Sequence, residues 1–238
     1  MKKILHKSDT RGHANHGWLE AKHSFSFASY YNPERMNFGS LRVLNDDIVQ
    51  PKMGFGTHPH QNMEIITIPL KGALSHKDSM GNKRTIEVNE IQVMSAGTGV
   101  THSEFNDSKT EEVNLLQLWI IPEEMNVQPN YEQRKFSKSE RLNVLQTIVA
   151  PKDKLEGEAI PISQQAYIYR IDLSSNNSIS LKLKEENNGF YIFNVDGTLS
   201  IAEETIAKRD AIGIYDTDGI EIKANEDSEL IIIEVPMI

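Results

Sequence analysis

The chain of 238 residues contains no cysteine. This absence excludes disulfide bonds, thiolate nucleophiles and sulfur ligands for zinc or an iron–sulfur cluster. Any bound metal ion must therefore be held by histidine, aspartate or glutamate side chains. A chain without disulfides also suits the reducing cytoplasm, and we expect the protein to be located there.

Long apolar segments and excess positive charge are missing as well. No run approaches the roughly 18 apolar residues of a membrane span, and no apolar stretch follows the basic start MKKILHKSDTRGH. We therefore expect neither a signal peptide nor a membrane partner. The 25 Lys and Arg residues are outnumbered by 34 Asp and Glu residues, which gives a net charge of −9. Because nucleic-acid affinity rests mainly on Lys and Arg contacts with phosphates, we expect no direct nucleic-acid partner.

Helical signals are scarce, and short apolar segments rich in β-branched residues dominate. The predicted strands are Leu41 to Leu44, Glu64 to Ile68, Ile91 to Met94, Leu115 to Ile121, Tyr167 to Leu173, Phe190 to Val195 and Leu230 to Val235. Glycine-containing turns such as Lys71-Gly72 and Asp196-Gly197 separate them. Many short strands with such turns predict a β sandwich or barrel. One short helix is predicted from about Ser139 to Leu145, with Ser137 or Ser139 as its N-cap.

A domain boundary is predicted in the polar, proline-containing stretch from about Val127 to Pro161. We expect an N-terminal domain over residues 1–127 and a linker with a C-terminal domain over residues 128–238. The tetrapeptide Gly72-Ala73-Leu74-Ser75 resembles Gly197-Thr198-Leu199-Ser200, and an apolar strand ending in proline follows each. This pattern suggests a duplicated β unit with loops of different length.

Histidine is confined to the first half, since none of the eight histidines follows His102. His58 and His60 lie two positions apart, so a strand would point both side chains to one face. His102 and Glu104 repeat that spacing. If the two segments pair, three nitrogens and one oxygen converge, a donor set that suits Fe, Mn, Co, Ni, Cu or Zn and leaves coordination positions open. We therefore predict one divalent transition-metal ion on His58, His60, His102 and Glu104.

Each pair alone has an ordinary explanation, because a His-x-His in a loop or a solvated His-x-Glu is common. The remaining candidates are also open to two interpretations. Glu64 is a hydrogen-bonded buried carboxylate or a fifth ligand, and His23 is a core histidine or part of the pocket. His76 is expected to be structural or exposed, and loop roles are expected for His13 and His16.

These residues carry a resemblance to the cupin superfamily and, within it, to the pirin family. GFGTHPHQNMEIITIPLKG resembles the first cupin motif, and SAGTGVTHSEFN resembles the second. The general cupin ligand set would use Glu64, whereas pirins resemble this chain in offering Glu104. The closing glycine, Gly72, is one residue late, and Ser95 stands where cupins often have proline. Further similar segments are RGHANHGWL, HSFSFASYY, NFGSLRVLNDD, HKDSMGN and PNYEQ.

The resemblance implies an all-β bicupin, with two jelly-roll barrels packed together and no metal site in the second. It also implies a dioxygenase that opens a quercetin-like flavonol with O2, with iron as the first expected ion and a monomer as the expected state. The alternative is a pirin-type regulatory or binding protein that needs metal but has no turnover. Glu104 would accept the proton of the flavonol 3-hydroxyl. Walls of the pocket, or else ordinary core, are expected at Phe25, Phe27, Phe38 and Phe55.

Overall fold

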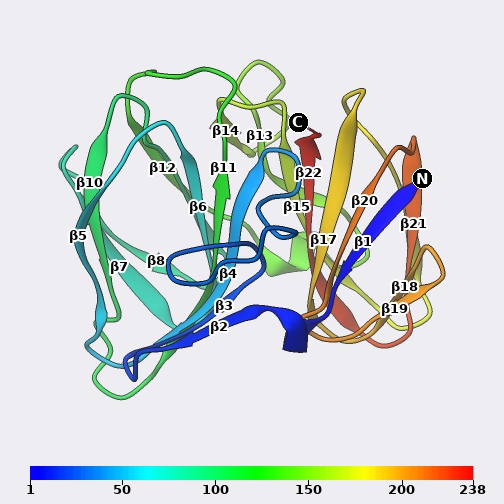
Figure 1. Ribbon diagram of the computed structural model, residues 1–238, viewed down its shortest axis with the longest axis horizontal. Coiled ribbons are helices and arrows are strands. Elements are labelled where there is room, and N and C mark those ends of the chain that lie inside the picture. Colours follow the sequence, from blue (N-terminus) through cyan, green and yellow to red (C-terminus); the bar gives the residue numbers. More distant parts are fainter. Residues whose placement is uncertain (238) are drawn as a thin grey trace.

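Four sheets, antiparallel except for one parallel strand pair in the C-terminal half, make up the computed structural model, which describes residues 1–237 (Figure 1). The strands of the N-terminal sheets are β2 (Gly12–Asn15), β3 (Leu19–His23), β4 (Leu41–Val49), β5 (Gly54–His60), β6 (Glu64–Lys71), β7 (Ala73–Asp78), β8 (Lys83–Glu87), β9 (Glu90–Ser95), β10 (Val100–Phe105), β11 (Val113–Ile120) and β12 (Asn130–Lys135). Those of the C-terminal sheets are β1 (Lys2–His6), β13 (Gln146–Pro151), β14 (Ile160–Ile162), β15 (Tyr167–Leu173), β16 (Ser178–Lys182), β17 (Asn188–Asp196), β18 (Leu199–Ile201), β19 (Glu204–Ile206), β20 (Ala211–Tyr215), β21 (Gly219–Ala224) and β22 (Ser228–Pro236). Two short 3-10 helices, η1 (Ser8–Thr10) and η2 (Lys138–Glu140), complete the elements.

Each half is a sandwich of one seven-stranded and one four-stranded sheet. In the N-terminal half the orders are β12-β9-β6-β11-β4-β3-β2 and β5-β10-β7-β8. In the C-terminal half they are β1-β20-β17-β22-β15-β13-β14 and β16-β21-β18-β19. The predicted all-β bicupin class is confirmed, although the hydrogen-bonded sheets have free edges and do not close into continuous barrels. No helix within residues 1–237 has the length and apolar character needed to cross a membrane.

The two seven-stranded sheets pack face to face and form the largest core. This core joins Ile66 and Leu118 of the N-terminal sheet to Phe193 and Ile231 of the C-terminal sheet. The four-stranded sheets therefore lie on the outside, with β5 and β10 at one end of the molecule and β18 and β21 at the other (Figure 1). Burial of apolar side chains from both halves stabilises the pair as one unit, because each buried side chain contributes about 1.5–3 kcal/mol.

Strand pairing crosses the predicted boundary at residue 127. β1, at the start of the chain, pairs with β20 in the C-terminal sheet, so the blue strand lies against the other half (Figure 1). Conversely, β12 follows the predicted boundary but pairs with β9 in the N-terminal sheet. A cut at residue 127 would therefore separate β1 from the C-terminal sheet and β12 from the N-terminal sheet. The division into 1–127 and 128–238 stays a prediction.

The predicted strands are confirmed, whereas the predicted helix is wrong. Every predicted strand overlaps an observed one, and β15 has the predicted bounds. At 139–145 only η2 forms, and the preceding Ser137 makes no side-chain capping bond. Backbone bonds tie the chain to Asp172 just afterwards, because Asp172 N donates to Arg141 O and Asn143 N donates to Asp172 O. These bonds hold the segment against β15 and stop the helix after one turn.

Candidate metal centre

The centre is built on β10, which lies between β5 and β7 in the outer sheet of the N-terminal half. Its burial alternates, with His102 and Glu104 buried while Thr101 and Phe105 are exposed. His102 lies opposite His58 in the register with β5, as the paired spacing predicts. The register then shifts between His102 and Glu104. This irregularity interrupts the ladder beside the site, a position where β-bulges often re-aim side chains.

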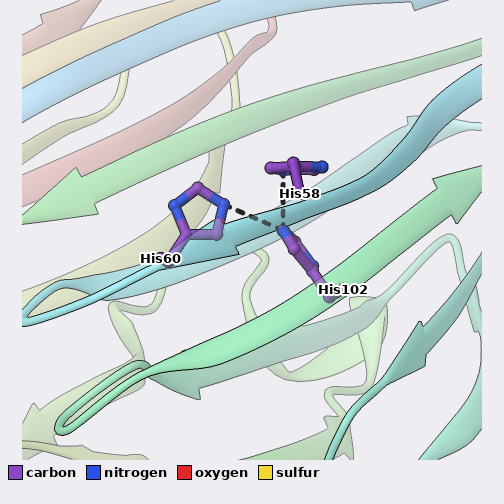
Figure 2. A group of neighbouring side chains, drawn as sticks. All are labelled: His58, His60 and His102. Carbon is purple, nitrogen blue, oxygen red and sulfur yellow. Dashed lines mark hydrogen bonds between the residues drawn. The ribbon is translucent and has the colours of Figure 1, made fainter.

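Three imidazoles point their Nε2 atoms at one place (Figure 2). The Nε2 of His102 lies 3.0 Å from that of His60 and 3.0 Å from that of His58. Two nitrogens about 2.1 Å from one ion at an angle of about 90° would be about 3.0 Å apart, whereas a tetrahedral angle would separate them by about 3.4 Å. The spacing therefore fits three adjacent positions of an octahedral ion, and the residues present fit a divalent transition metal.

The protonation of these histidines suits ligation, which requires a free nitrogen lone pair. Burial lowers the pKa of His102 to about 2, with the nearby His58 and His60 as further causes. Burial also lowers the pKa of His60 to about 4. The Nδ1 of His58 lies 2.8 Å from the carbonyl oxygen of Gly56, which can only accept. A neutral His58 therefore carries its proton on Nδ1 and leaves Nε2 free to bind a metal ion.

Glu104 stands beside this triad as a buried carboxyl group. Burial raises its pKa from 4.5 to about 7, opposed by a hydrogen bond from Thr67. Thr67 Oγ1 donates to Glu104 Oε1 at 3.4 Å and accepts from Gln117 Nε2 at 3.0 Å. The ligand atom of Glu104 lies within 4.8 Å of those of His76 and His102, a grouping distinct from that of the three histidines. The role of Glu104 as a ligand therefore stays a prediction.

A small cavity of about 70 Å³ adjoins the triad and is lined by both His58 and Glu104. Of the predicted aromatic walls, Phe27 and Phe55 line it. Phe25 and Phe38 do not, because they belong to the core between the seven-stranded sheets. Sequence reasoning missed the remaining lining residues, which are Asn45, Asp47, Leu115, Gln117 and Trp119. A signal was present for the three polar ones, because Asn45, Asp47 and Gln117 are buried in strands whose other buried residues are mostly apolar.

Glu64 lies on β6 but faces away from the metal centre. It is 1% exposed and accepts hydrogen bonds from Ser95 Oγ at 2.6 Å and from the backbone of Ser163 at 3.3 Å. Its neighbour Thr67 points to the opposite face, where it contacts Glu104. Glu64 is thus a hydrogen-bonded buried carboxyl group, which was the first of its two predicted interpretations.

The other histidines separate into structural and surface groups. His23 is buried, and its Nδ1 lies 2.9 Å from the side chain of Asn45, which lines the cavity. His76 lies within β7 and is 1% exposed. The loop role predicted for His13 is wrong, because it lies in β2, half exposed and 3.3 Å from Glu20, whereas His16 lies in a loop as predicted. None of His13, His16 and His23 joins the triad, whereas His76 lies directly behind it.

Comparison with known families assigns both halves of the chain. The Pirin family matches residues 5–120, and the family described as "Quercetinase C-terminal cupin domain" matches residues 147–235. A protein named quercetin 2,3-dioxygenase from Escherichia coli K12 is 42% identical over 232 residues, covering 98% of each chain. A pirin-like protein from Caulobacter vibrioides is 38% identical over 226 residues and covers 95% of this chain and 96% of its own.

A solved structure agrees with the sequence relatives. The crystal structure of bacterial pirin YhhW from Escherichia coli, in complex with nickel(II), has a TM-score of 0.93 at 40% identity and covers 100% of both chains. That protein was therefore captured with a divalent transition metal. Together with the two family matches and the cluster of imidazoles on β5 and β10, this similarity shows that the chain belongs to the pirin family of bicupins.

Proposed function

We propose that the protein is a metal-dependent dioxygenase that opens a quercetin-like flavonol with O2. His58, His60, His102 and Glu104 would hold one divalent transition-metal ion, with iron as the first candidate and Mn, Co, Ni, Cu or Zn as alternatives. The observation that carries the proposal is the convergence of three Nε2 atoms, 3.0 Å apart in two pairs, beside a cavity that also contains a buried carboxyl group. The relatives named quercetin 2,3-dioxygenase support the choice of reaction.

When bound, the ion supplies a Lewis acid that lowers the pKa of a ligating hydroxyl group and a redox centre for reaction with dioxygen. Glu104 is placed to take the proton of the flavonol 3-hydroxyl. Its pKa of about 7 matches a general base that works near neutral pH. Because Thr67 donates to Oε1, we assign the proton transfer to Oε2.

The aromatic lining would bind the flat flavonol ring and exclude water. Phe27 packs edge to face on Trp119 with ring centroids 5.3 Å apart, and Trp119 packs on His60 at 4.9 Å. Phe55 lies across the same cavity. Apolar walls beside the reacting edge strengthen electrostatic interactions there, because the local dielectric constant is low.

The size of the cavity favours one alternative function. Pockets for ligands of flavonol size usually measure about 300–1,000 Å³, whereas this cavity measures about 70 Å³. At this volume the cavity is too small to enclose a whole flavonol. A regulatory protein that uses its metal to control partner binding, without turnover, would need no larger space.

The deciding experiment is metal analysis of the purified protein, followed by oxygen uptake with a panel of flavonols. We expect flavonol-dependent uptake in the metal-loaded wild type. Glu104→Gln should lower the rate by about 10²- to 10⁴-fold at matched metal loading, because the amide keeps the size but loses nearly all basicity. Glu64→Gln is the matched control, since it alters a buried glutamate on the far face of the sheet and should leave the rate per bound ion unchanged.

Two results would count against the proposal. A Glu104→Gln variant that is fully loaded and equally active would remove this carboxylate from the chemistry. A wild type without flavonol turnover on any of Fe, Mn, Co, Ni or Cu would favour the regulatory alternative, particularly if metal changed partner binding without consuming oxygen.

A further inference from the structure

The segment HKDSMGN, residues 76–82, lies directly behind His102 and has no part in the chemistry described so far. It forms the end of β7 and the turn into β8. Gly81 has a φ of 96°, which suits glycine at the tip of this turn. In the register of the sheet, His102 lies opposite Asp78 and Glu104 lies opposite His76. The segment thus lies alongside both inward-facing residues of β10.

Asp78 is held by four donors, although its side chain is fully buried. The backbone N–H groups of Met80 and Asn82 each donate to Oδ1 at 2.9 Å. The side-chain amide of Asn82 donates to Oδ2 at 2.8 Å, and His76 Nε2 lies 3.2 Å from the same oxygen. Because an ionised carboxylate only accepts hydrogen bonds, the proton between them belongs to Nε2 of His76.

This assignment determines which nitrogen carries the proton in the contact between His76 and His102. A neutral His76 with its proton on Nε2 has a free lone pair on Nδ1, which can only accept. The Nδ1 of His102 lies 3.5 Å away and must therefore be the donor. His102 then has no hydrogen on Nε2, and the same holds for His58, whose Nδ1 donates to Gly56. With neither Nε2 protonated, the 3.0 Å contact between these two atoms is not a hydrogen bond, and the distance is one that two ligands around one ion would have.

We propose that Asp78 and His76 are positioning residues that hold His102 in its metal-binding tautomer through the chain of hydrogen bonds Asp78–His76–His102. The proposal rests on the metal site proposed above. Partners that hold the second nitrogen of a ligating histidine raise its basicity and fix its ring. The negative charge of Asp78, passed through His76, would make His102 the strongest donor of the triad. The backbone N–H groups of the turn at 78–82 would keep that carboxylate oriented.

The test compares His76→Phe, which keeps a buried ring and removes both nitrogens, with His76→Asn, whose side-chain oxygen can replace Nδ1 as acceptor but cannot reach Asp78. Nickel(II) affinity, measured by competition with a chromophoric chelator, should fall about 10- to 100-fold in His76→Phe and less in His76→Asn. His6→Phe is the matched control: His6 is also buried, beside Tyr191 in the core between the sheets, and its loss should leave nickel affinity unchanged.

The tautomer itself is read from ¹H–¹⁵N correlation spectra of the imidazoles in metal-free protein. The wild type and His76→Asn should show His102 protonated on Nδ1, and His76→Phe should show both tautomers. Asp78→Asn provides a second route if His76→Phe does not fold, with an expected loss of about 10-fold in nickel affinity. Wild-type affinity together with an unchanged His102 tautomer in these variants would overturn the proposal, as would a second nickel ion bound by His76, His102 and Glu104. If the wild type binds no nickel at all, the proposed metal site fails, while the spectra still report on the hydrogen-bond chain.

Discussion

The buried carboxyl group of Glu104 should make stability depend on pH in the metal-free protein but not in the metal-loaded one. Burial raises its pKa in the folded state from 4.5 to about 7. Between these values the unfolded chain loses its proton while the folded protein keeps it, so stability falls as pH rises through this window. A difference of about 2.5 pKa units at 1.36 kcal/mol each corresponds to about 3 kcal/mol lost from the free energy of unfolding.

The perturbation that isolates this effect is Glu104→Gln, measured by urea denaturation of chelator-treated protein at about pH 4 and about pH 8, on either side of the window. Buried histidines contribute with the opposite sign, because the lowered pKa values of His60 and His102 cost stability as pH falls below 6.5. Their contribution is common to both proteins. From the lower to the higher pH, the free energy of unfolding of the wild type should therefore fall by about 3 kcal/mol relative to that of Glu104→Gln.

Two comparisons make this result diagnostic. Glu112→Gln, at a carboxylate that is 41% exposed beside Lys71, should follow the wild type. Saturation with nickel(II) should abolish the difference, because a nearby cation favours the charged carboxylate. Equal pH dependence of metal-free wild type and Glu104→Gln would refute the reasoning, since it would mean that Glu104 ionises as freely in the fold as in water.

Three further outcomes are expected. Elemental analysis of protein purified without chelator should approach one ion per chain, and changing both His58 and His60 to Ala should remove it; two ions, or one retained by the double variant, would contradict the site. Metal affinity should fall between about pH 7.5 and about pH 5.5, because Glu104 takes up a proton below its pKa of about 7; an affinity that stays flat would argue against Glu104 as a ligand. Leu118→Ala should lower the free energy of unfolding by about 2–5 kcal/mol in a urea titration, because it leaves a hole between the two halves, and a loss below about 1 kcal/mol would contradict that shared core.

Strands were predictable here because buried strands consist mostly of apolar and β-branched residues, which can be recognised locally in the sequence. Tyr167 to Leu173 is apolar except for Arg170 and Asp172, and the structure forms a largely buried strand with the same bounds. The exchange of edge strands was not predictable. Lys2–His6 has no local feature that distinguishes a strand of the near half from one of the far half, because its partner β20 lies more than 200 residues away.

The metal centre shows the same limit. The spacing of His58 with His60 predicts one shared face, and that much follows from the geometry of any strand. Placing His76 behind His102 requires knowing that β7 pairs with β10, which no spacing along the chain reveals. Glu64 shows the converse, because closeness in sequence does not place a residue at the site. It is only four residues from His60, but β5 and β6 belong to different sheets, and the Glu64 side chain is on the face of β6 that points away from the imidazoles.

The outer sheets of the two halves have the same strand order but differ in the residues at the candidate metal centre. Its outer sheet has the order β16-β21-β18-β19, which matches β5-β10-β7-β8 position by position, and the glycines before β7 and β18 both have positive φ. This correspondence supports a duplicated unit. The ladder of β16 and β21 contains the apolar pairs Leu181 with Ile220 and Ile179 with Ile222, whereas that of β5 and β10 contains His58 opposite His102.

The apolar cluster inside that half is one continuous group that includes two tyrosines, one of which donates to the buried Glu234. In the first half the apolar interior is split into two small clusters, with the imidazoles, Thr67 and Glu104 on neighbouring strands. Buried polar groups of this kind cost stability unless each has a partner. The shared core between the seven-stranded sheets offsets that cost, because it ties the polar half to an apolar one. The apolar core shared with the C-terminal half thus adds stability to the half that contains the buried imidazoles and Glu104.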